Sequence, residues 1–198
     1  MMGEDADSIM GRLAGSILRA YAYGHRRILA LAEQLTEEGL RRQPAPEVLP
    51  VAFHLWHVAR WADYTQAVIP GMTPELSRLL PPSEQIWEVE RLEDRWGFTD
   101  ALGAAATGMD MDDATAARLP YPAKEELIAY ARRAFAAVEQ AAAAIPPDQM
   151  EAHEQWQPIT DGIWGDSTVG DALLDHVAHD ALHLGHMQSV AGLLRGRE

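Results

Sequence analysis

The strongest structural signal of this chain lies in residues 175–186, which read DHVAHDALHLGH. Four histidines stand here at spacings of three, four and three residues. At about 100° per residue, they fall within an arc of roughly 80° on a helix. Continued toward the C-terminus, the same arc meets Met187, Val190 and Leu194, apolar residues that should face a core. The histidines therefore occupy positions where a plain helical core would place leucines.

Amphipathic patterns on either side of this segment predict four long helices. Thr168 and Asp171 have the spacing of a capping box and open the last helix, which we expect to end near Arg195. Apolar residues recur every three or four positions over residues 8–35, 51–69 and 122–145, and Pro122 is a favourable first-turn residue for the third of these helices. A polar, proline-containing linker separates the first two helices.

The interval from residue 73 to residue 120 contains several prolines and glycines and favours a long connection with short helices. We find neither a convincing alternating strand pattern nor an internal repeat. The sequence therefore predicts an all-α protein, a four-helix bundle with a long crossover connection between its second and third helices. We expect residues 1–198 to form a single domain, since the length and the 47% of apolar residues suit one core.

The net charge of -14, from 30 acidic and 16 basic residues, disfavours nucleic acid and anionic membrane surfaces as partners. The acidic N-terminal residues do not resemble a secretory signal, and no run is long enough to span a bilayer, so we expect a cytoplasmic protein. The chain has no cysteine, which excludes disulfides, cysteine-ligated zinc, iron-sulfur clusters and a catalytic thiol of its own. Any thiol chemistry would need an external thiol.

A second group of histidines lies on the helix predicted over residues 51–69. His57 shares a helix face with Phe53 and Trp61, and His54 lies to one side of that face. In the last helix His179 and His183 are four residues apart, so their Cβ atoms should lie about 5–6 Å apart. Both rings can then reach one ion at roughly 2.0–2.1 Å, and a third imidazole from a facing helix would complete the set.

A single buried histidine is more often a hydrogen-bonded core residue than a ligand, and isolated His-x-x-x-His pairs arise by chance. Several inward imidazoles without compensating carboxylates are costly, however, unless a bound cation satisfies them. We therefore predict a divalent metal site in which zinc, nickel and ferrous iron are equally suitable. His54, His176 and His186 are candidates for additional ligands or for residues that orient the ligands. His25 and His153 carry no signal beyond surface or loop positions.

Several enzyme classes are excluded by missing motifs. The segment from His179 to His183 lacks the glutamate that serves as general base in His-Glu-x-x-His proteases. The chain also has no Gly-x-Ser-x-Gly elbow, no P-loop and no dinucleotide-binding glycine pattern.

Residues 52–63, AFHLWHVARWAD, together with residues 175–186, resemble the signature helices of the DinB-like superfamily of metalloenzymes. The resemblance extends over nearly the whole chain. It implies a four-helix bundle, frequent homodimers, and a nickel, zinc or iron site whose ligands fall on His57, His179 and His183. In characterised branches it also implies transfer or isomerisation chemistry with thiols such as mycothiol or bacillithiol. Relatives often carry glutamine where this chain has His186.

The leading functional hypothesis is a metal-dependent transferase that joins an external low-molecular-weight thiol to a small electrophilic substrate. Arg60, one turn from His57, is a candidate to bind a substrate carboxylate or the thiol, and Asp63 and Asp180 could orient ligand rings. A solvated salt bridge for Arg60 and Asp63, and a surface charge for Asp180, are equally good interpretations.

Two other hypotheses remain open at this point. The first is a non-catalytic metal-binding or stress-response protein in which the ion cross-links the helices through its ligands. The second is a metal-free protein that dimerises through aromatic loops around Trp87, Trp96 and Trp164, although these side chains are better explained as core and loop anchors.

Overall fold

The computed structural model describes residues 2–153 and 167–196. Within these ranges the chain forms helices and two isolated bridges, between Ala104 and Met109 and between His153 and Thr168, but no strand. The expected all-α class is confirmed.

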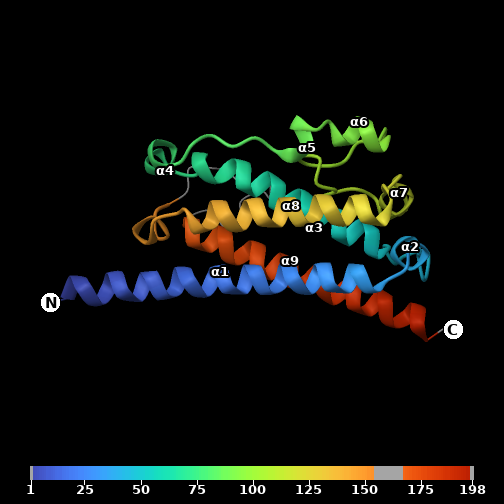
Figure 1. Ribbon diagram of the computed structural model, residues 1–198, viewed down its shortest axis with the longest axis horizontal. Coiled ribbons are helices and arrows are strands. Elements are labelled where there is room, and N and C mark those ends of the chain that lie inside the picture. Colours follow the sequence, from blue (N-terminus) through green and yellow to red (C-terminus); the bar gives the residue numbers. More distant parts are fainter. Residues whose placement is uncertain (1, 154–166, 197–198) are drawn as a thin grey trace.

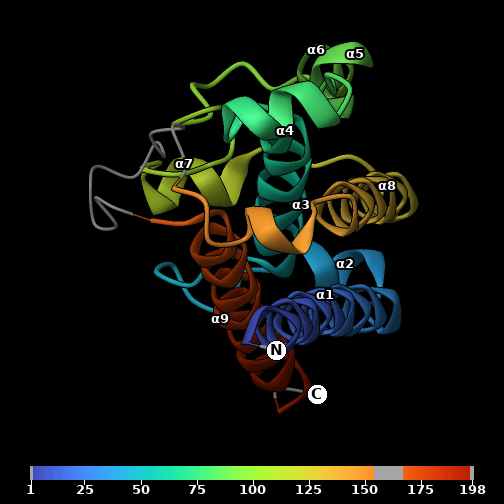
Figure 2. The ribbon, with the colours of Figure 1, turned by 90° about the vertical axis from the view of Figure 1, so that its left-hand side faces the viewer.

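Four long helices make up most of the molecule: α1 (Met2–Gln34), α3 (Val51–Val68), α8 (Lys124–Ala143) and α9 (Val169–Arg195). They run along the long dimension of the molecule (Figure 1). Helices α1 and α3 each pack against both α8 and α9, and the view along the helices shows α3 between α8 and α9 (Figure 2). This packing places one face of α3 directly against α9.

Short helices fill the connections between the long ones. The interval between α3 and α8 contains η1 (Ile69–Gly71), α4 (Pro74–Leu79), α5 (Ile86–Val89), α6 (Leu92–Trp96) and α7 (Asp113–Arg118), which confirms the expected long connection with short helices. Helix η2 (Pro147–Gln149) follows α8. The polar linker after α1 contains the short helix α2 (Glu37–Arg41), in which the Thr36 side chain accepts a hydrogen bond from the Gly39 N–H and so caps the helix.

Two helix starts show how local and distant contacts set these boundaries. The capping box of α9 is present as expected: Thr168 Oγ1 accepts from the Asp171 N–H at 3.1 Å, and Asp171 Oδ2 accepts from the Thr168 N–H at 3.0 Å. Helix α8, in contrast, begins at Lys124 rather than at Pro122, as the sequence suggested. The Lys124 N–H donates to Glu37 Oε2 at 2.7 Å, so a carboxylate from another helix satisfies this first-turn donor.

Helix α3 lies at the centre of the core. Every residue from Val51 to Asp63 is buried, because α8, α9 and the connection after α3 cover it on different sides. Trp87 and Trp96 belong to this core with 3% and 7% of their surfaces exposed, and their rings pack edge to face. The structure therefore contradicts a partner surface built on these two tryptophans. Trp164 lies outside the described residues.

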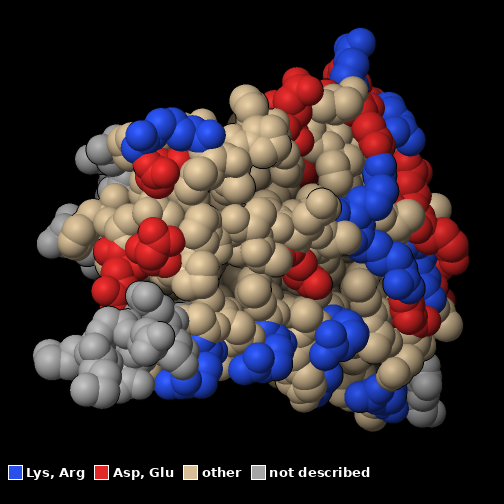
Figure 3. All heavy atoms as spheres, turned by 60° about the vertical axis from the view of Figure 1, so that its left-hand side comes forward, with Lys and Arg blue, Asp and Glu red and all other residues tan. Residues whose placement is uncertain are grey.

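Charges of both signs cover the surface. On the face drawn in Figure 3, Lys and Arg side chains form a row along the lower edge, acidic and basic side chains alternate along the right-hand side, and uncharged residues occupy most of the middle. Among the described helices, none combines the length and the apolar character that crossing a membrane requires.

Candidate metal centre

The three histidines that the sequence singled out lie together where α3 faces α9. His57 comes from α3, and His179 and His183 come from α9. One ring nitrogen of each lies within 4.8 Å of one ring nitrogen of the other two. The His57 Nε2 and His179 Nε2 atoms are 3.1 Å apart. Two nitrogens bound to one ion at about 2.1 Å would be separated by roughly 3.0–3.4 Å, so this spacing suits a shared cation.

A backbone carbonyl sets the tautomer of His57. Its Nδ1 lies 2.6 Å from the Thr107 carbonyl oxygen, which can only accept, so Nδ1 carries the proton. The lone pair is therefore on Nε2 and points toward His179. Burial lowers the pKa of His57 to about 3 and also lowers the pKa of His183, with further lowering from neighbouring imidazoles. Both rings are neutral at pH 7, the state that a metal ion requires.

The second ligand, His179, has a carboxylate beside it. His179 Nδ1 is a buried atom without a hydrogen-bond partner among the described residues, and the closest anionic oxygen is Asp180 Oδ1 at 3.7 Å. Asp180 is 5% exposed, which contradicts its interpretation as a surface charge. A carboxylate at the outer nitrogen of an imidazole orients the ring and raises its basicity as a ligand. The donor set and its surroundings thus fit a divalent metal ion.

His25 extends this arrangement into α1. It is 1% exposed, its Nε2 lies 3.0 Å from Asp180 Oδ2, and its Nδ1 lies 2.7 Å from Glu139 Oε1 of α8. Burial by itself would lower the pKa of His25, but the hydrogen bonds to Asp180 and Glu139 outweigh burial and raise it. The surface position expected for His25 was wrong. A line of contacts now runs from Glu139 through His25 and Asp180 to the ring of His179.

We expect Asp180→Asn to weaken metal binding by about 10- to 100-fold, because the asparagine keeps the size of the side chain but removes the negative charge beside His179. Competition with a chromophoric chelator would measure the affinity. Asp175→Asn is the matched control, since it removes the same charge from an exposed position on the same helix. Equal affinities of the two variants would show that Asp180 does not act on the centre.

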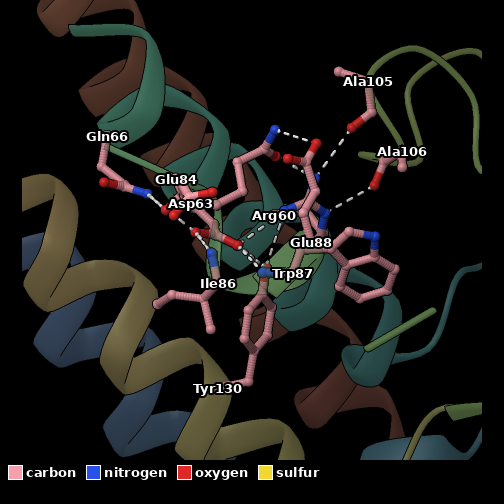
Figure 4. A network of polar contacts seen from close by, with 11 residues as sticks. Arg60, Asp63, Gln66, Glu84, Ile86, Trp87, Glu88, Ala105, Ala106 and Tyr130 are labelled. Carbon is pink, nitrogen blue, oxygen red and sulfur yellow. Dashed lines mark hydrogen bonds and ion pairs between the residues drawn. The ribbon is translucent and has the colours of Figure 1, made fainter. Parts of the chain in front are cut away.

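Arg60 lies one turn from His57 but belongs to a different buried network (Figure 4). It is 1% exposed, and its guanidinium lies over the Trp87 ring at 4.7 Å. All five of its N–H donors have acceptors, which are the Ala105 and Ala106 carbonyls, Asp63 Oδ2, Gln85 Oε1 and the Tyr130 hydroxyl. No donor is left for a substrate carboxylate, so the geometry gives Arg60 a structural role instead of the expected substrate contact.

Asp63, the partner of Arg60, caps a helix rather than orienting a histidine. It is fully buried and accepts hydrogen bonds from the Ile86 and Trp87 N–H groups, each at 2.8 Å, and from the Tyr130 hydroxyl at 3.0 Å. Ile86 and Trp87 form the first turn of α5, whose N–H groups have no partner within the helix. The salt bridge of Arg60 and Asp63 is therefore buried and not solvated. It ties α3 to the connection that follows it.

The network of Arg60 reaches the metal centre through the loop of residues 102–109. Ala105 and Ala106 have φ values of 48° and 53°, a conformation that alanine rarely adopts. Arg60 holds both of their carbonyl oxygens, at 3.1 Å and 2.9 Å, and the next carbonyl, that of Thr107, accepts from His57. Arg60 thus fixes the loop whose carbonyl orients His57. Sequence reasoning could not find this link, because no local pattern marks the loop.

Gly108 allows this loop to approach the centre. Its φ is 90°, and an added Cβ would lie 2.7 Å from Trp56 Cζ3 and 3.2 Å from His57 Nδ1. We expect Gly108→Ala to lower the free energy of unfolding by roughly 3 kcal/mol, from backbone strain and overpacking together. Gly97→Ala is the control, since Gly97 has a φ of 72° with nothing within 4 Å of an added Cβ. It should cost only about 1 kcal/mol.

Urea unfolding would compare the two glycine variants, and metal titration would follow in each. Gly108→Ala should also weaken metal binding, because the clash lies against His57, whereas Gly97→Ala should not. Similar stabilities of both variants would contradict the close approach of this loop.

The remaining histidines divide into three cases. His176 belongs to neither histidine group and contacts Thr65, with its Nε2 2.7 Å from Thr65 Oγ1. His54 and His186 form a second group with His183. His153 is exposed in the loop before α9, as expected.

Four long helices with inward imidazoles on α3 and α9 define an all-α protein with a candidate divalent-metal centre. A sequence model of the DinB superfamily matches residues 20–187, and the chain belongs to this superfamily, as the sequence resemblance suggested.

The fold also resembles a solved structure, described as the conserved protein of locus from Enterococcus faecalis. The two share 17% sequence identity with a TM-score of 0.72, over 92% of this chain and 96% of that one. At this identity the likeness concerns the fold alone. No curated protein shows significant sequence similarity to the chain.

Proposed function

We propose that this chain is a metal-dependent enzyme that transfers a low-molecular-weight thiol, of the mycothiol or bacillithiol type, to a small electrophilic substrate. The observation that carries this proposal is the convergence of three imidazoles from α3 and α9, with His57 Nε2 and His179 Nε2 3.1 Å apart. In this proposal the four long helices act as a four-helix bundle, in which the connection after α3 crosses over to α8.

A bound zinc, nickel or ferrous ion would lower the pKa of a thiol and so supply a sulfur nucleophile at neutral pH. This matters because the chain has no cysteine of its own. His57, His179 and His183 would hold the ion, and Thr107 and Asp180 would orient His57 and His179.

Aromatic side chains shape the surroundings of this site. Phe53 stacks on the His57 ring at 5.3 Å between centroids, and Trp61 lies edge-on to His57 and His179 at 6.4 Å and 6.0 Å. They keep water from one side of the imidazoles, which strengthens electrostatic interactions there. The His179 side chain is 25% exposed, so an external thiol and its substrate would approach from the side of α9.

The proposal is tested by elemental analysis of the purified protein and by conjugation assays. Glutathione, mycothiol and bacillithiol would each be supplied with 1-chloro-2,4-dinitrobenzene, with and without added Zn²⁺, Ni²⁺ or Fe²⁺. We expect thiol-dependent turnover that disappears in His57→Ala and persists in His153→Ala, the control at an exposed histidine. Metal binding without turnover for any of these thiols would contradict the transferase proposal.

A non-catalytic metal-binding role, for example in a stress response, is the second candidate. It is favoured by one observation: His54 and His186 form a further histidine group with His183 beside the candidate centre. If the protein coordinated its ion entirely through side chains, no position would remain for a thiol. Binding of a thiol to the Co²⁺-loaded protein, seen as a sulfur-to-cobalt charge-transfer band, would separate the two candidates.

A further inference from the structure

We propose that His54, His183 and His186 form a second site for a divalent transition-metal ion, adjacent to the candidate centre and sharing His183 with it. The proposal concerns metal binding alone and does not depend on the thiol chemistry.

The three residues meet the geometric requirement for a common ion. One ring nitrogen of each lies within 4.8 Å of one ring nitrogen of the other two. His54 Nδ1 and His183 Nδ1 are 2.9 Å apart, and the His186 ring centroid lies 5.3 Å from that of His54 and 5.8 Å from that of His183. The ring nitrogens of His57, His179 and His183 meet the same distance criterion.

The packing of α3 on α9 explains why the arrangement repeats. Thr65 contacts His176, His57 contacts His179 and His183, and His54 contacts His183 and His186. Residue numbers thus fall along α3 as they rise along α9, so the two helices run antiparallel. His54 stands three residues before His57, and His186 three residues after His183, a displacement of about 4.5 Å along each helix. The second group is therefore the first group moved by nearly one turn.

The chemistry of the group favours borderline transition metals. The group consists of nitrogen ligands alone, which suits Zn²⁺, Ni²⁺, Co²⁺ and Cu²⁺ and disfavours Mg²⁺ and Ca²⁺. His54 is 5% exposed, and burial favours its neutral ring, which keeps a lone pair available. The Nδ1 atoms of His54 and His183 face each other at 2.9 Å, and a cation bound between them would satisfy two lone pairs at once.

Two features make this site weaker than the first. His186 is exposed, so ordering its ring on an ion costs side-chain entropy that the buried ligands have already lost on folding. In addition, a neutral imidazole has a single lone pair, so His183 can serve one ion at a time. The second site is therefore filled when the first group is incomplete or its ion is absent.

The test removes His179, which belongs to the first group alone, and measures whether a metal ion still binds. In His179→Ala we expect one Co²⁺ or Zn²⁺ ion to bind with micromolar affinity, measured by calorimetry and by the visible spectrum of Co²⁺. Adding His186→Gln should weaken that binding at least 100-fold. The matched control is His179→Ala with His176→Gln, which removes a histidine of the same helix that lies outside both groups and should leave the affinity unchanged.

His179 is partly exposed and His186 is exposed, so these variants should fold, which circular dichroism checks. Absence of binding in His179→Ala would overturn the second site, and so would equal binding by His179→Ala with and without His186→Gln. Neither result bears on thiol-dependent turnover of the native chain, so failure of this inference and failure of the transferase proposal are distinguishable.

Discussion

Replacement of Asp63 by alanine is expected to lower the free energy of unfolding by about 3–5 kcal/mol, a large part of the stability of an ordinary domain. The change leaves the Arg60 guanidinium buried at 1% exposure without its counter-charge. It also leaves the Ile86 and Trp87 N–H groups of α5 without their acceptor. Both losses act in the core between α3 and the connection that follows it.

Chemical denaturation followed by tryptophan fluorescence measures this effect, with Asp94→Ala as the matched control. Asp94 also forms an Arg–Asp pair at a spacing of three residues, with Arg91, but both side chains are more than half exposed. Such a surface pair contributes at most about 1 kcal/mol. If the free energy of unfolding fell by the same small amount in both variants, the buried Arg60–Asp63 pair would contribute no more to stability than the exposed pair.

The metal-free protein is expected to lose about 5 kcal/mol of stability between pH 7 and pH 5. Burial lowers the pKa of His54 and His176 to about 4 and of His57 to about 3, and it also lowers the pKa of His183. At these four positions the unfolded chain takes up protons near pH 6.5, whereas the folded chain does so only well below pH 5. Protons therefore favour the unfolded state as the pH falls below 6.5, by up to about 1.4 kcal/mol per histidine and pH unit.

His25 acts in the opposite direction, because its raised pKa favours the folded state at low pH, but it is one residue against four. Denaturation curves in the presence of a chelator at pH 7, 6 and 5 would measure the slope. His176→Gln should reduce the slope by roughly a quarter, while His153→Gln at an exposed position should leave it unchanged. A stability that is flat over this range would contradict neutral, buried imidazoles at these positions.

Helical periodicity explains what could be predicted from the sequence. The spacing of the α9 histidines and the aromatic face around His57 are local properties, and they pointed to the three residues that the structure brings together. His25 was missed although the same signal was present. It continues the pattern of Tyr21 and Ile28 at intervals of four and three residues, all three of which are buried.

Contacts between distant segments could not be predicted in this way. Asp63 caps α5 from 23 residues away, and Glu37 meets the first residue of α8 from 87 residues away. The loop of residues 102–109 depends on Arg60 for its unusual backbone conformation, so its own sequence does not indicate its shape. The role of Arg60 follows from these contacts and not from its spacing to His57.

The contact between His57 and His179 joins residues that are 122 positions apart in the chain. During synthesis the first of them leaves the ribosome long before α9 exists, so a partly made chain has one ligand of the set and no centre. The affinity for an ion therefore arises only when the last helix docks. From that moment a bound ion would add stability according to its concentration relative to its dissociation constant, about 2.7 kcal/mol at a hundredfold excess. An ion bound at this centre would thus stabilise only chains in which the last helix has docked against α3.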